Sequence, residues 1–283
     1  MADSPVHYLA IGHVAKDLTP NGPRLGGTVS FSSLTALALE YSPGVVTACG
    51  ADLDLSQLNG VQLALVPSSD STTYENVYGP AGREQFVRAL AAPLTFQAIP
   101  PTWLSAPVIH LAPLGHEIDL SLLDGLGSGF VGVTPQGWLR QWDEAGRVRP
   151  AVESWTGAAR VLDRASAVVL SLDDIGRDWA VAERWARLTR VLVVTEGANG
   201  CSVFVRGQGA QQFMAPPEAE VDPTGAGDVF AAAFFVNYYE TGDAWASARF
   251  ANHVAAWSVT RVGLAGVPSV EVVGLCRVAA NRP

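Results

Sequence analysis

Short apolar runs along the chain alternate with longer stretches in which apolar residues recur at helical spacing. The runs cover residues 6–11, 108–111, 130–133, 167–170 and 191–195. Such runs suit strands buried on both faces of a parallel sheet, because polar and apolar residues alternate only where one face meets water. The helix-like stretches cover residues 26–41, 179–188, 227–239 and 244–260. The alternation predicts a doubly wound, mostly parallel α/β sheet.

Two of the helix-like stretches show residues gathered on one face. In residues 26–41 these are Phe31, Leu34, Leu37, Ala38 and Tyr41, which follow the 3.6-residue period. In residues 227–239 Phe230, Ala233, Phe234 and Asn237 share one face.

Residues 69–88 break this rhythm. Two roughly alternating segments flank Gly79-Pro-Ala-Gly82, which is typical of a β-hairpin. Alternation implies one solvated face, so the hairpin is expected to form a small flap or lid outside the main sheet. Residues 13–25 are a second candidate segment for this lid. No stretch resembles a long linker, so residues 1–283 are expected to form a single domain.

Composition narrows the class of protein. Of the 283 residues 48% are hydrophobic and 16% charged, which argues against a disordered chain. The net charge of −9 argues against binding to a nucleic-acid backbone, which basic proteins usually perform. Lys16 is the only lysine, so 17 of the 18 basic residues are arginines. Any mechanism that requires a lysine therefore has one candidate.

The cysteines and the N-terminus bear on the compartment. The three cysteines are widely spaced and form no C-x-x-C pair, which argues against a disulfide framework or a zinc site. The first residues lack a basic signal-peptide region, and no apolar run approaches the length of a membrane span. These features predict a cytoplasmic protein without membrane contact.

The strongest local motif is Val221-Asp-Pro-Thr-Gly-Ala-Gly-Asp-Val-Phe230. Its small residues, Gly225 to Gly227, let the backbone approach a ligand closely, and a helix begins at once. Free N–H groups at a helix start bind anions, and the helix dipole favours an ionised Asp228. A carboxylate beside an anion hole suits phosphoryl transfer to an alcohol. The alternative is a helix-capping aspartate after a glycine turn.

Asp222-Pro-Thr-Gly-Ala-Gly-Asp228 resembles the C-terminal signature of the ribokinase (PfkB) family of ATP-dependent sugar and nucleoside kinases. Four further segments are similar to family motifs in the same order along the chain: residues 10–17, 25–30, 193–200 and 258–263. The resemblance implies a kinase that uses ATP and Mg²⁺, with K⁺ as a further candidate. By the family pattern Asp228 is the catalytic base, and Gly225, Ala226 and Gly227 complete the anion hole.

The same resemblance implies the other site residues. Substrate hydroxyls would contact Asp17, Gly26, Gly27 and Ser30, and the nucleotide would contact Thr195, Gly197, Gly200, Thr224 and Asn252. Asp174 would orient Mg²⁺-bound water, and Asp222 would hold the monovalent cation.

Two more residues are substrate candidates by their predicted positions. Arg83 lies in the predicted flap, and Gln136 follows a strand at the edge of the sheet where open α/β proteins bind ligands. An exposed hairpin arginine and a solvated loop glutamine are the alternatives.

The chain departs from the family pattern at two motifs. Ser30 stands where the family usually has asparagine, and Ser171-Leu-Asp-Asp174 stands where it has N-x-x-E. Asp173 or Asp174 is expected to turn inward, since carboxylate oxygens suit Mg²⁺; a solvated pair that opens a helix is the alternative. The altered motif also keeps open a ligand-binding homologue that has lost turnover.

The motifs around Gly26, the flap and Val221 look more like the myo-inositol kinase branch than ribokinase or adenosine kinase. A polyhydroxylated ring, inositol or a sugar, is therefore the favoured substrate, and Tyr74 and Tyr78 in the flap keep a nucleoside as the alternative. Small molecules are the expected partners, with a homodimer through the lid as one arrangement.

Three further features are interpreted as structural. Gly127-Ser-Gly-Phe-Val-Gly132 spells a dinucleotide fingerprint but leads into a predicted strand instead of following one, so it is expected to be a connection. His110 and His116 lack metal-ligand spacing and are expected to pack structurally.

Overall fold

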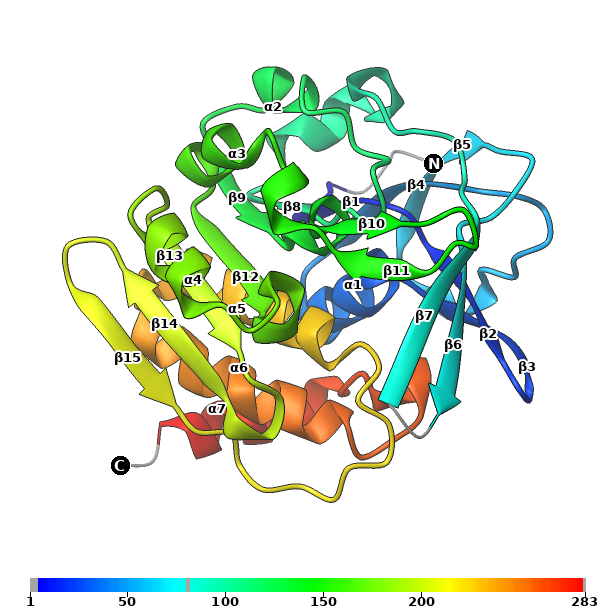
Figure 1. The fold of residues 1–283 in the computed structure, drawn as a ribbon. Helices are drawn as coiled ribbons and strands as arrows, with labels where there is room; N and C mark the ends of the chain where they lie inside the picture. The colour runs from blue at the N-terminus through cyan, green and yellow to red at the C-terminus, as the bar shows by residue number, and fades with distance from the viewer. Residues whose placement is uncertain (1–4, 80–81, 282–283) are drawn as a thin grey trace.

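The structure is a computed structural model that describes residues 5–79 and 82–281, apart from the side chains of residues 78, 79, 82 and 83. A nine-stranded sheet forms its centre (Figure 1). In spatial order the strands are β15 (Gly209–Phe213), β14 (Cys201–Val205), β13 (Val191–Thr195), β12 (Ala167–Ser171), β9 (Phe130–Val133), β8 (Val108–Leu111), β1 (Tyr8–Ile11), β4 (Pro43–Cys49) and β5 (Gln62–Pro67). All neighbours from β13 to β5 are parallel, and β14 and β15 add an antiparallel edge. The predicted fold class is confirmed.

Helices cover both faces of this sheet. One face carries α1 (Thr28–Ala38), α5 (Ala226–Thr241), α6 (Ala244–Ser258) and α7 (Val270–Ala280), and the other carries α2 (Leu122–Gly125), α3 (Ala158–Arg164) and α4 (Trp179–Ala186). A hydrophobic core lies on each face of the sheet, and strand β1 contributes to both. Tyr8 and Ala10 pack on the first face, and Leu9 and Ile11 pack on the second.

Single-turn 3₁₀ helices connect these elements. They are η1 (Ser56–Leu58), η2 (Phe96–Ala98), η3 (Pro101–Ser105), η4 (Pro135–Leu139), η5 (Val152–Ser154), η6 (Leu172–Ile175), η7 (Gly197–Asn199) and η8 (Gly263–Gly266). The predicted connection at residues 127–129 lies outside regular structure and leads into β9, so the dinucleotide-fingerprint alternative is wrong for this segment.

The helices α1 and α5 bury more than the one face that the sequence indicates. Residues 229–236 of α5 are buried all the way round, and α1 buries Ser30 and Thr35 while Leu34 and Leu37 stay half-buried. The reason is that α1 and α5 pack against each other as well as against the sheet. A helix enclosed on several sides carries no single apolar stripe, so the 3.6-residue period indicates only part of its buried surface.

A separate four-stranded sheet lies beside the main one, in the order β3 (Gly22–Gly26), β2 (Ala15–Thr19), β6 (Thr73–Gly79), β7 (Gly82–Ala89). We call this sheet the lid. It contains both segments predicted from the sequence, because β2 pairs with β3 and, in parallel, with β6. A hairpin formed by β10 (Arg140–Trp142) and β11 (Val148–Pro150) lies against β7 (Figure 1).

Buried polar groups hold the base of the lid to the main sheet. The Glu117 carboxylate accepts hydrogen bonds from the backbone N–H groups of His13, Leu114 and Gly115 at 2.7–3.1 Å. The His13 ring bonds the Thr72 hydroxyl through Nδ1 and the Ala92 carbonyl through Nε2, at 2.7 and 2.9 Å. These contacts join the start of β2 to the start of β6, so the base of the lid is fixed against the carboxyl ends of the sheet.

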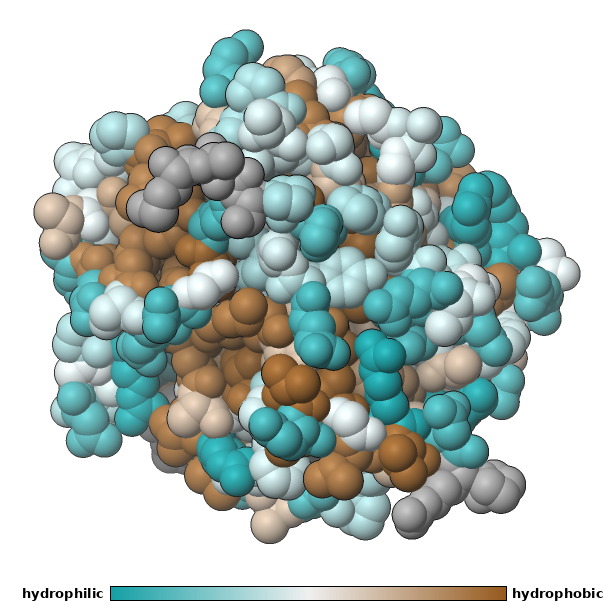
Figure 2. All heavy atoms as spheres, turned by 180° about the vertical axis from the view of Figure 1, so that it is seen from behind, coloured by the Kyte–Doolittle hydropathy of each residue, from teal (hydrophilic) through white to brown (hydrophobic). Residues whose placement is uncertain are grey.

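The surface carries apolar areas among the polar ones. Figure 2 shows them on the back of the molecule, interspersed with hydrophilic side chains. Exposed apolar residues include Leu65 on β5 and Leu275 on α7. Among the described helices, none combines the length and the hydropathy that crossing a membrane requires.

Candidate active site

Two helices begin where the parallel strands end. The first residue of α1 is Thr28, and Asp228 lies in the first turn of α5. The Thr28 side chain donates a hydrogen bond to Asp228, so the two N-termini converge on one point. Asp17, on lid strand β2, and Asp174, after β12, also act electrostatically on Asp228. The fold therefore brings together carboxylates from three distant parts of the sequence.

The turn before α5 requires a glycine. Gly225 has φ +81°, and a Cβ atom there would lie 2.3 Å from the Phe31 ring. Within the described chain no acceptor binds the N–H groups of Gly227 and Asp228, whereas the Ala226 N–H donates to the Pro223 carbonyl at 3.2 Å. Two of the predicted anion-hole donors are therefore available to a ligand, and the Ala226 N–H is already engaged.

Asp228 has the electrostatic properties of a proton acceptor. The residue keeps some solvent exposure, but protein atoms surround its carboxyl. Burial raises the pKa of Asp228 to about 7, while the Thr28 hydrogen bond and the Arg140 guanidinium act in the opposite direction. Asp174 and Asp17 raise the pKa further by repulsion. A group that titrates near neutrality can take up a proton and release it again.

The structure decides between the two neighbouring aspartates. Asp173 is exposed and pairs with Arg177 at 2.8 Å. Asp174 turns inward, where its Oδ2 accepts from the Ser171 N–H at 2.9 Å and its Oδ1 from Gln136 Nε2 at 3.3 Å. Burial raises the pKa of Asp174, which Arg140 partly offsets. Gln136 is thus connected to the site by its hydrogen bond to the Asp174 carboxylate.

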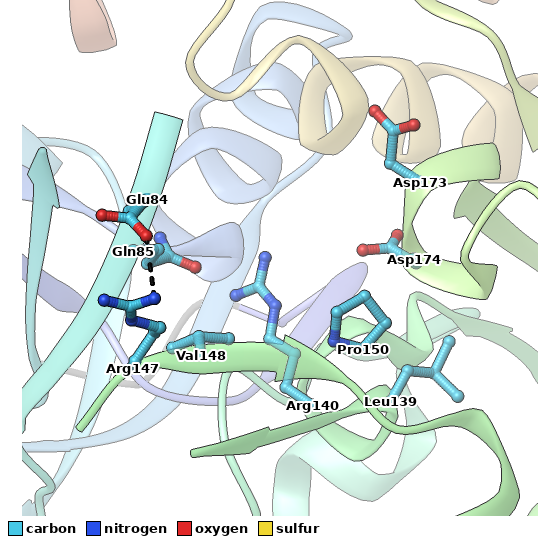
Figure 3. A pocket seen from close by; sticks show the side chains of 9 residues that line it. All are labelled: Glu84, Gln85, Leu139, Arg140, Arg147, Val148, Pro150, Asp173 and Asp174. Carbon is cyan, nitrogen blue, oxygen red and sulfur yellow. Dashed lines mark ion pairs between the residues drawn. The ribbon is translucent and has the colours of Figure 1, made fainter. Parts of the chain in front are cut away.

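Arg140 is the site residue that the sequence analysis missed. It begins β10 and lines a cavity of about 280 Å³ together with Gln85, Arg147 and Asp174. Figure 3 shows its side chain rising into the middle of this cavity. No sequence signal marks it, because it is one arginine among 17 and belongs to no motif. Only the fold of the 140–150 hairpin places it beside the carboxylates.

The substrate-side candidates gather at the lid. A Cβ atom on Gly26 would lie 2.0 Å from Asp17 Oδ2, so the carboxylate rests directly on the Gly26 backbone. Gly27 has φ +89° and caps α1. The Ser30 hydroxyl is fully buried and donates to the Gly26 carbonyl at 2.7 Å, so Ser30 supports this turn from behind. Arg83 belongs to β7, but its side chain lies outside the described residues.

The nucleotide-side candidates are more scattered. Thr195 ends β13, and Gly197 and Gly200 follow it with φ +60° and +86°. Thr224 is exposed beside the α5 turn. Asn252 is buried, and its Nδ2 donates to the Phe213 carbonyl at 3.0 Å, so its amide anchors the chain after β15.

Asp222 bridges two loops. Its Oδ1 accepts from the Thr224 N–H and its Oδ2 from the Gly263 N–H, each at 3.0 Å. These and neighbouring hydrogen bonds outweigh its partial burial and lower the pKa of Asp222. The carboxylate therefore stays ionised and braces the α5 turn against η8.

The two histidines are structural. His110 is buried between the Tyr8 hydroxyl and the Thr134 hydroxyl, and burial lowers its pKa to about 3. His116 bonds the Arg140 carbonyl through Nε2 at 2.8 Å and packs against Trp142. Among the described residues, neither ring belongs to a group of three or more His, Cys, Asp or Glu side chains that could hold a metal ion.

A family model agrees with this geometry. Residues 176–270, which contain Asp222, the α5 turn and Asp228, match the model of the pfkB family carbohydrate kinases. The resemblance to this family that was inferred from the motifs is confirmed, and the protein is a phosphotransferase.

Relatives within the family differ in substrate. A cytidine kinase of Thermococcus kodakarensis is 24% identical over 249 residues, which cover 81% of this chain and 87% of that protein. An inositol 3-kinase of Zea mays is 32% identical over 133 residues, which cover 47% of this chain and 34% of the maize protein.

Solved structures share the fold of this chain. A pyrophosphate-dependent kinase in the ribokinase family, complexed with a pyrophosphate analog and myo-inositol, superposes with a TM-score of 0.74 at 21% identity, over 90% of this chain and 96% of the other. A ribokinase II candidate from E. coli, complexed with ATP and Mg²⁺, gives 0.75 at 18% identity, over 97% and 99%. At such identities the likeness concerns the fold alone.

Proposed function

We propose that this pfkB protein transfers the γ-phosphoryl group of ATP to a hydroxyl of a small polyhydroxylated ring, inositol or a sugar. The observation that supports this most directly is the pairing of a near-neutral Asp228 carboxyl with the unbonded N–H groups of Gly227 and Asp228 at the start of α5. Asp228 accepts the hydroxyl proton, and the N–H groups stabilise charge on the phosphoryl oxygens. These are the two functions that phosphoryl transfer to an alcohol demands.

The carboxylate oxygens of Asp174 are suited to a hard divalent cation such as Mg²⁺. Asp174 offers an inward carboxylate whose Oδ1 and Oδ2 each accept one hydrogen bond, so lone pairs remain for a Mg²⁺-bound water. Bound Mg²⁺ would neutralise the donor phosphates. Asp174 replaces the family glutamate with a side chain one methylene shorter, which fits a contact through water.

A monovalent cation is a further part of this proposal. Asp222 is ionised and linked to the loop that begins at Gly263. Carbonyl oxygens of residues 262–266 together with Asp222 would supply the oxygen cage that the family resemblance implies for K⁺. The ion would then stiffen the turn that presents the Gly227 N–H.

A polyol is favoured over a nucleoside because of Tyr74. This ring is 2% exposed, and its hydroxyl donates to the Leu114 carbonyl at 2.7 Å, so it offers no face on which a base could stack. Tyr78, the other candidate, has a side chain outside the described residues. Asp17 on the Gly26 backbone instead offers fixed hydrogen-bonding groups to ring hydroxyls. Such a site rejects analogues that lack a hydroxyl, since a buried polar group would remain unpaired.

A substrate screen tests this function. We expect the purified protein to phosphorylate at least one of myo-inositol, other inositols, ribose or fructose with ATP, and to leave adenosine, cytidine and uridine unchanged. Pyrophosphate is included as a second donor, and Na⁺ replaces K⁺ in parallel reactions. Turnover of a nucleoside alone would reverse the substrate assignment. Absence of turnover with every acceptor and both donors would favour the ligand-binding alternative.

The pH dependence of turnover is a second expected result. Because burial raises the pKa of Asp228 to about 7, the base is increasingly protonated below neutrality. We expect kcat to rise about tenfold per pH unit between pH 5.5 and 6.5 and to level off above pH 8. Rapid-quench measurements isolate the chemical step. A chemical rate that stays constant from pH 5.5 to 8 would contradict the role of Asp228.

A further inference from the structure

Arg140 occupies a position between the groups assigned to the reaction. In Figure 3 its guanidinium lies between Gln85 of the lid and Asp174 of η6. It acts electrostatically on both Asp174 and Asp228, on the metal side and the base side of the site. Its guanidinium donates a hydrogen bond to the hydroxyl of Tyr74, a neutral group. In the described part of the chain no carboxylate lies within 4 Å of its nitrogens, so no ion pair neutralises its charge.

Arg147, the other arginine in the cavity, has a different environment. It pairs with Glu84 of β7 at 3.1 Å and lies over the Phe86 ring. Its charge is thus balanced locally, and it holds the hairpin to the lid. This difference singles out Arg140 as the cation that can meet an anionic group.

The hairpin that carries Arg140 is fastened to the lid. The Val87 N–H donates to the Gly146 carbonyl at 2.8 Å, and Arg88 Nη1 donates to the Ala145 carbonyl at 3.2 Å. Trp142 and Val148 pack against the small apolar core of the lid, which contains Tyr74 and Val87. A displacement of β7 must therefore move the 140–150 hairpin with it, because these contacts would otherwise break.

We propose that Arg140 binds non-bridging oxygens of the phosphoryl group during transfer, and that the hairpin brings it to the site together with the lid. This rests on the proposed function. In the step, the acceptor hydroxyl gives its proton to Asp228 as its oxygen bonds to the γ-phosphorus. The bond from that phosphorus to the β-γ bridging oxygen breaks, and ADP leaves with the electron pair. Arg140 exchanges no proton and stabilises the charge on the three spectator oxygens.

The position of Arg140 fits the path of the phosphoryl group. The phosphoryl must pass between the donor side, marked by Asp174, and the hydroxyl beside Asp228. Arg140 acts electrostatically on both carboxylates, so its positive charge lies near that path and offsets the repulsion between the carboxylates and the phosphoryl oxygens.

Substitutions of Arg140 test the contact, with the acceptor and donor that the wild-type protein turns over. We expect Arg140→Gln to lower kcat about 10²–10³-fold with the acceptor KM within about threefold of wild type. Arg140→Lys should recover only part of the lost kcat, because lysine keeps the positive charge but lacks the planar guanidinium that can donate two hydrogen bonds to one phosphoryl group. Arg149→Gln, an exposed change on the same hairpin, is the matched control and should retain full kcat.

Chemical rescue separates contact from folding. Free guanidinium should raise the kcat of Arg140→Ala, whereas the same concentration of Na⁺ should not. A kcat of Arg140→Gln within threefold of wild type overturns the proposal while leaving the kinase function standing. If the wild-type protein phosphorylates no acceptor, the proposed function itself fails.

A double-mutant cycle tests the coupling to the lid. A Cβ atom on Gly146 would lie 2.3 Å from the Val87 carbonyl oxygen, and Gly146 has φ +82°. We expect Gly146→Ala to lower kcat about five- to tenfold in the wild type and to cost nothing more in Arg140→Gln, because both changes remove one contact. Arg88→Ala, which removes the hydrogen bond to the Ala145 carbonyl, is a second variant that weakens the contact between the hairpin and the lid. Equal losses in both backgrounds would show that the hairpin does not act through Arg140.

Discussion

Replacing Asp228 with asparagine is expected to lower kcat by roughly two to four powers of ten, because the variant lacks the carboxylate that we propose as acceptor of the hydroxyl proton. The amide keeps the shape of the side chain and the N–H groups of the α5 turn, so nucleotide binding should persist. Steady-state kinetics with the acceptor identified in the screen, together with calorimetric titration of ATP, measures both. An Asp228→Asn enzyme with wild-type kcat would refute the assignment of the base.

The same variant is expected to be more stable than the wild type at pH 8. Burial raises the pKa of Asp228 from 3.8 to about 7, so the folded state binds this proton more tightly than the unfolded state. The wild type therefore loses stability as the pH rises from about 4 to 7, and the full loss is present above 7.

Asparagine carries no charge and escapes this loss. We expect the free energy of unfolding at pH 8 to increase by about 1–2 kcal/mol, since the partial solvent exposure of Asp228 reduces the effect of a shift of this size. The difference should disappear below pH 4. Urea titrations at pH 8 and pH 4 provide the comparison, and a variant less stable than wild type at pH 8 would contradict the burial of the charge.

Replacing Gly225 with alanine is expected to impair both folding and turnover. The new Cβ atom would lie 2.3 Å from the Phe31 ring, at a φ of +81° that alanine rarely adopts. Crowding and backbone strain together should destabilise the protein by about 2–4 kcal/mol. Displacement of the turn also misdirects the Gly227 N–H, so kcat should fall by about 10²-fold or more. Thermal unfolding and kinetics below the transition temperature measure the two effects separately.

Gly227→Ala is the matched control for stability. Its Cβ atom would meet nothing within 4 Å, and alanine favours a helix more than glycine does. We expect an unchanged or slightly raised free energy of unfolding. If Gly225→Ala and Gly227→Ala unfolded at the same temperature, the contact between the α5 turn and Phe31 would not constrain the site.

Much of the fold and the location of the site could be predicted from local pattern. The strands β8, β9 and β13 begin and end at the predicted residues, because uninterrupted apolar runs are the signature of a sheet buried on both faces. The hairpin around residue 80 was predicted from alternation and a glycine turn. The α5 turn with Asp228 was predicted from a short run of small residues before a helix. Each of these signals lies within about ten consecutive residues.

The tertiary structure alone decided how these pieces meet. The choice of Asp174 over Asp173, the supporting role of Ser30 and the enclosure of α5 depend on what packs against each residue. The pKa of Asp228 depends on burial and on charges from β2, β10 and η6, which are far apart in the sequence.

Arg140 shows the division most clearly. The sequence determined the α/β fold and the glycine turn that leads into Asp228, since both follow from backbone conformation and residue type over a short span. It did not determine that an unmarked arginine, 88 residues before Asp228, would act on that carboxylate. Electrostatic interaction depends on distance in space and on the surrounding dielectric. Both quantities are set only when the chain folds and brings the lid, the 140–150 hairpin and the sheet together.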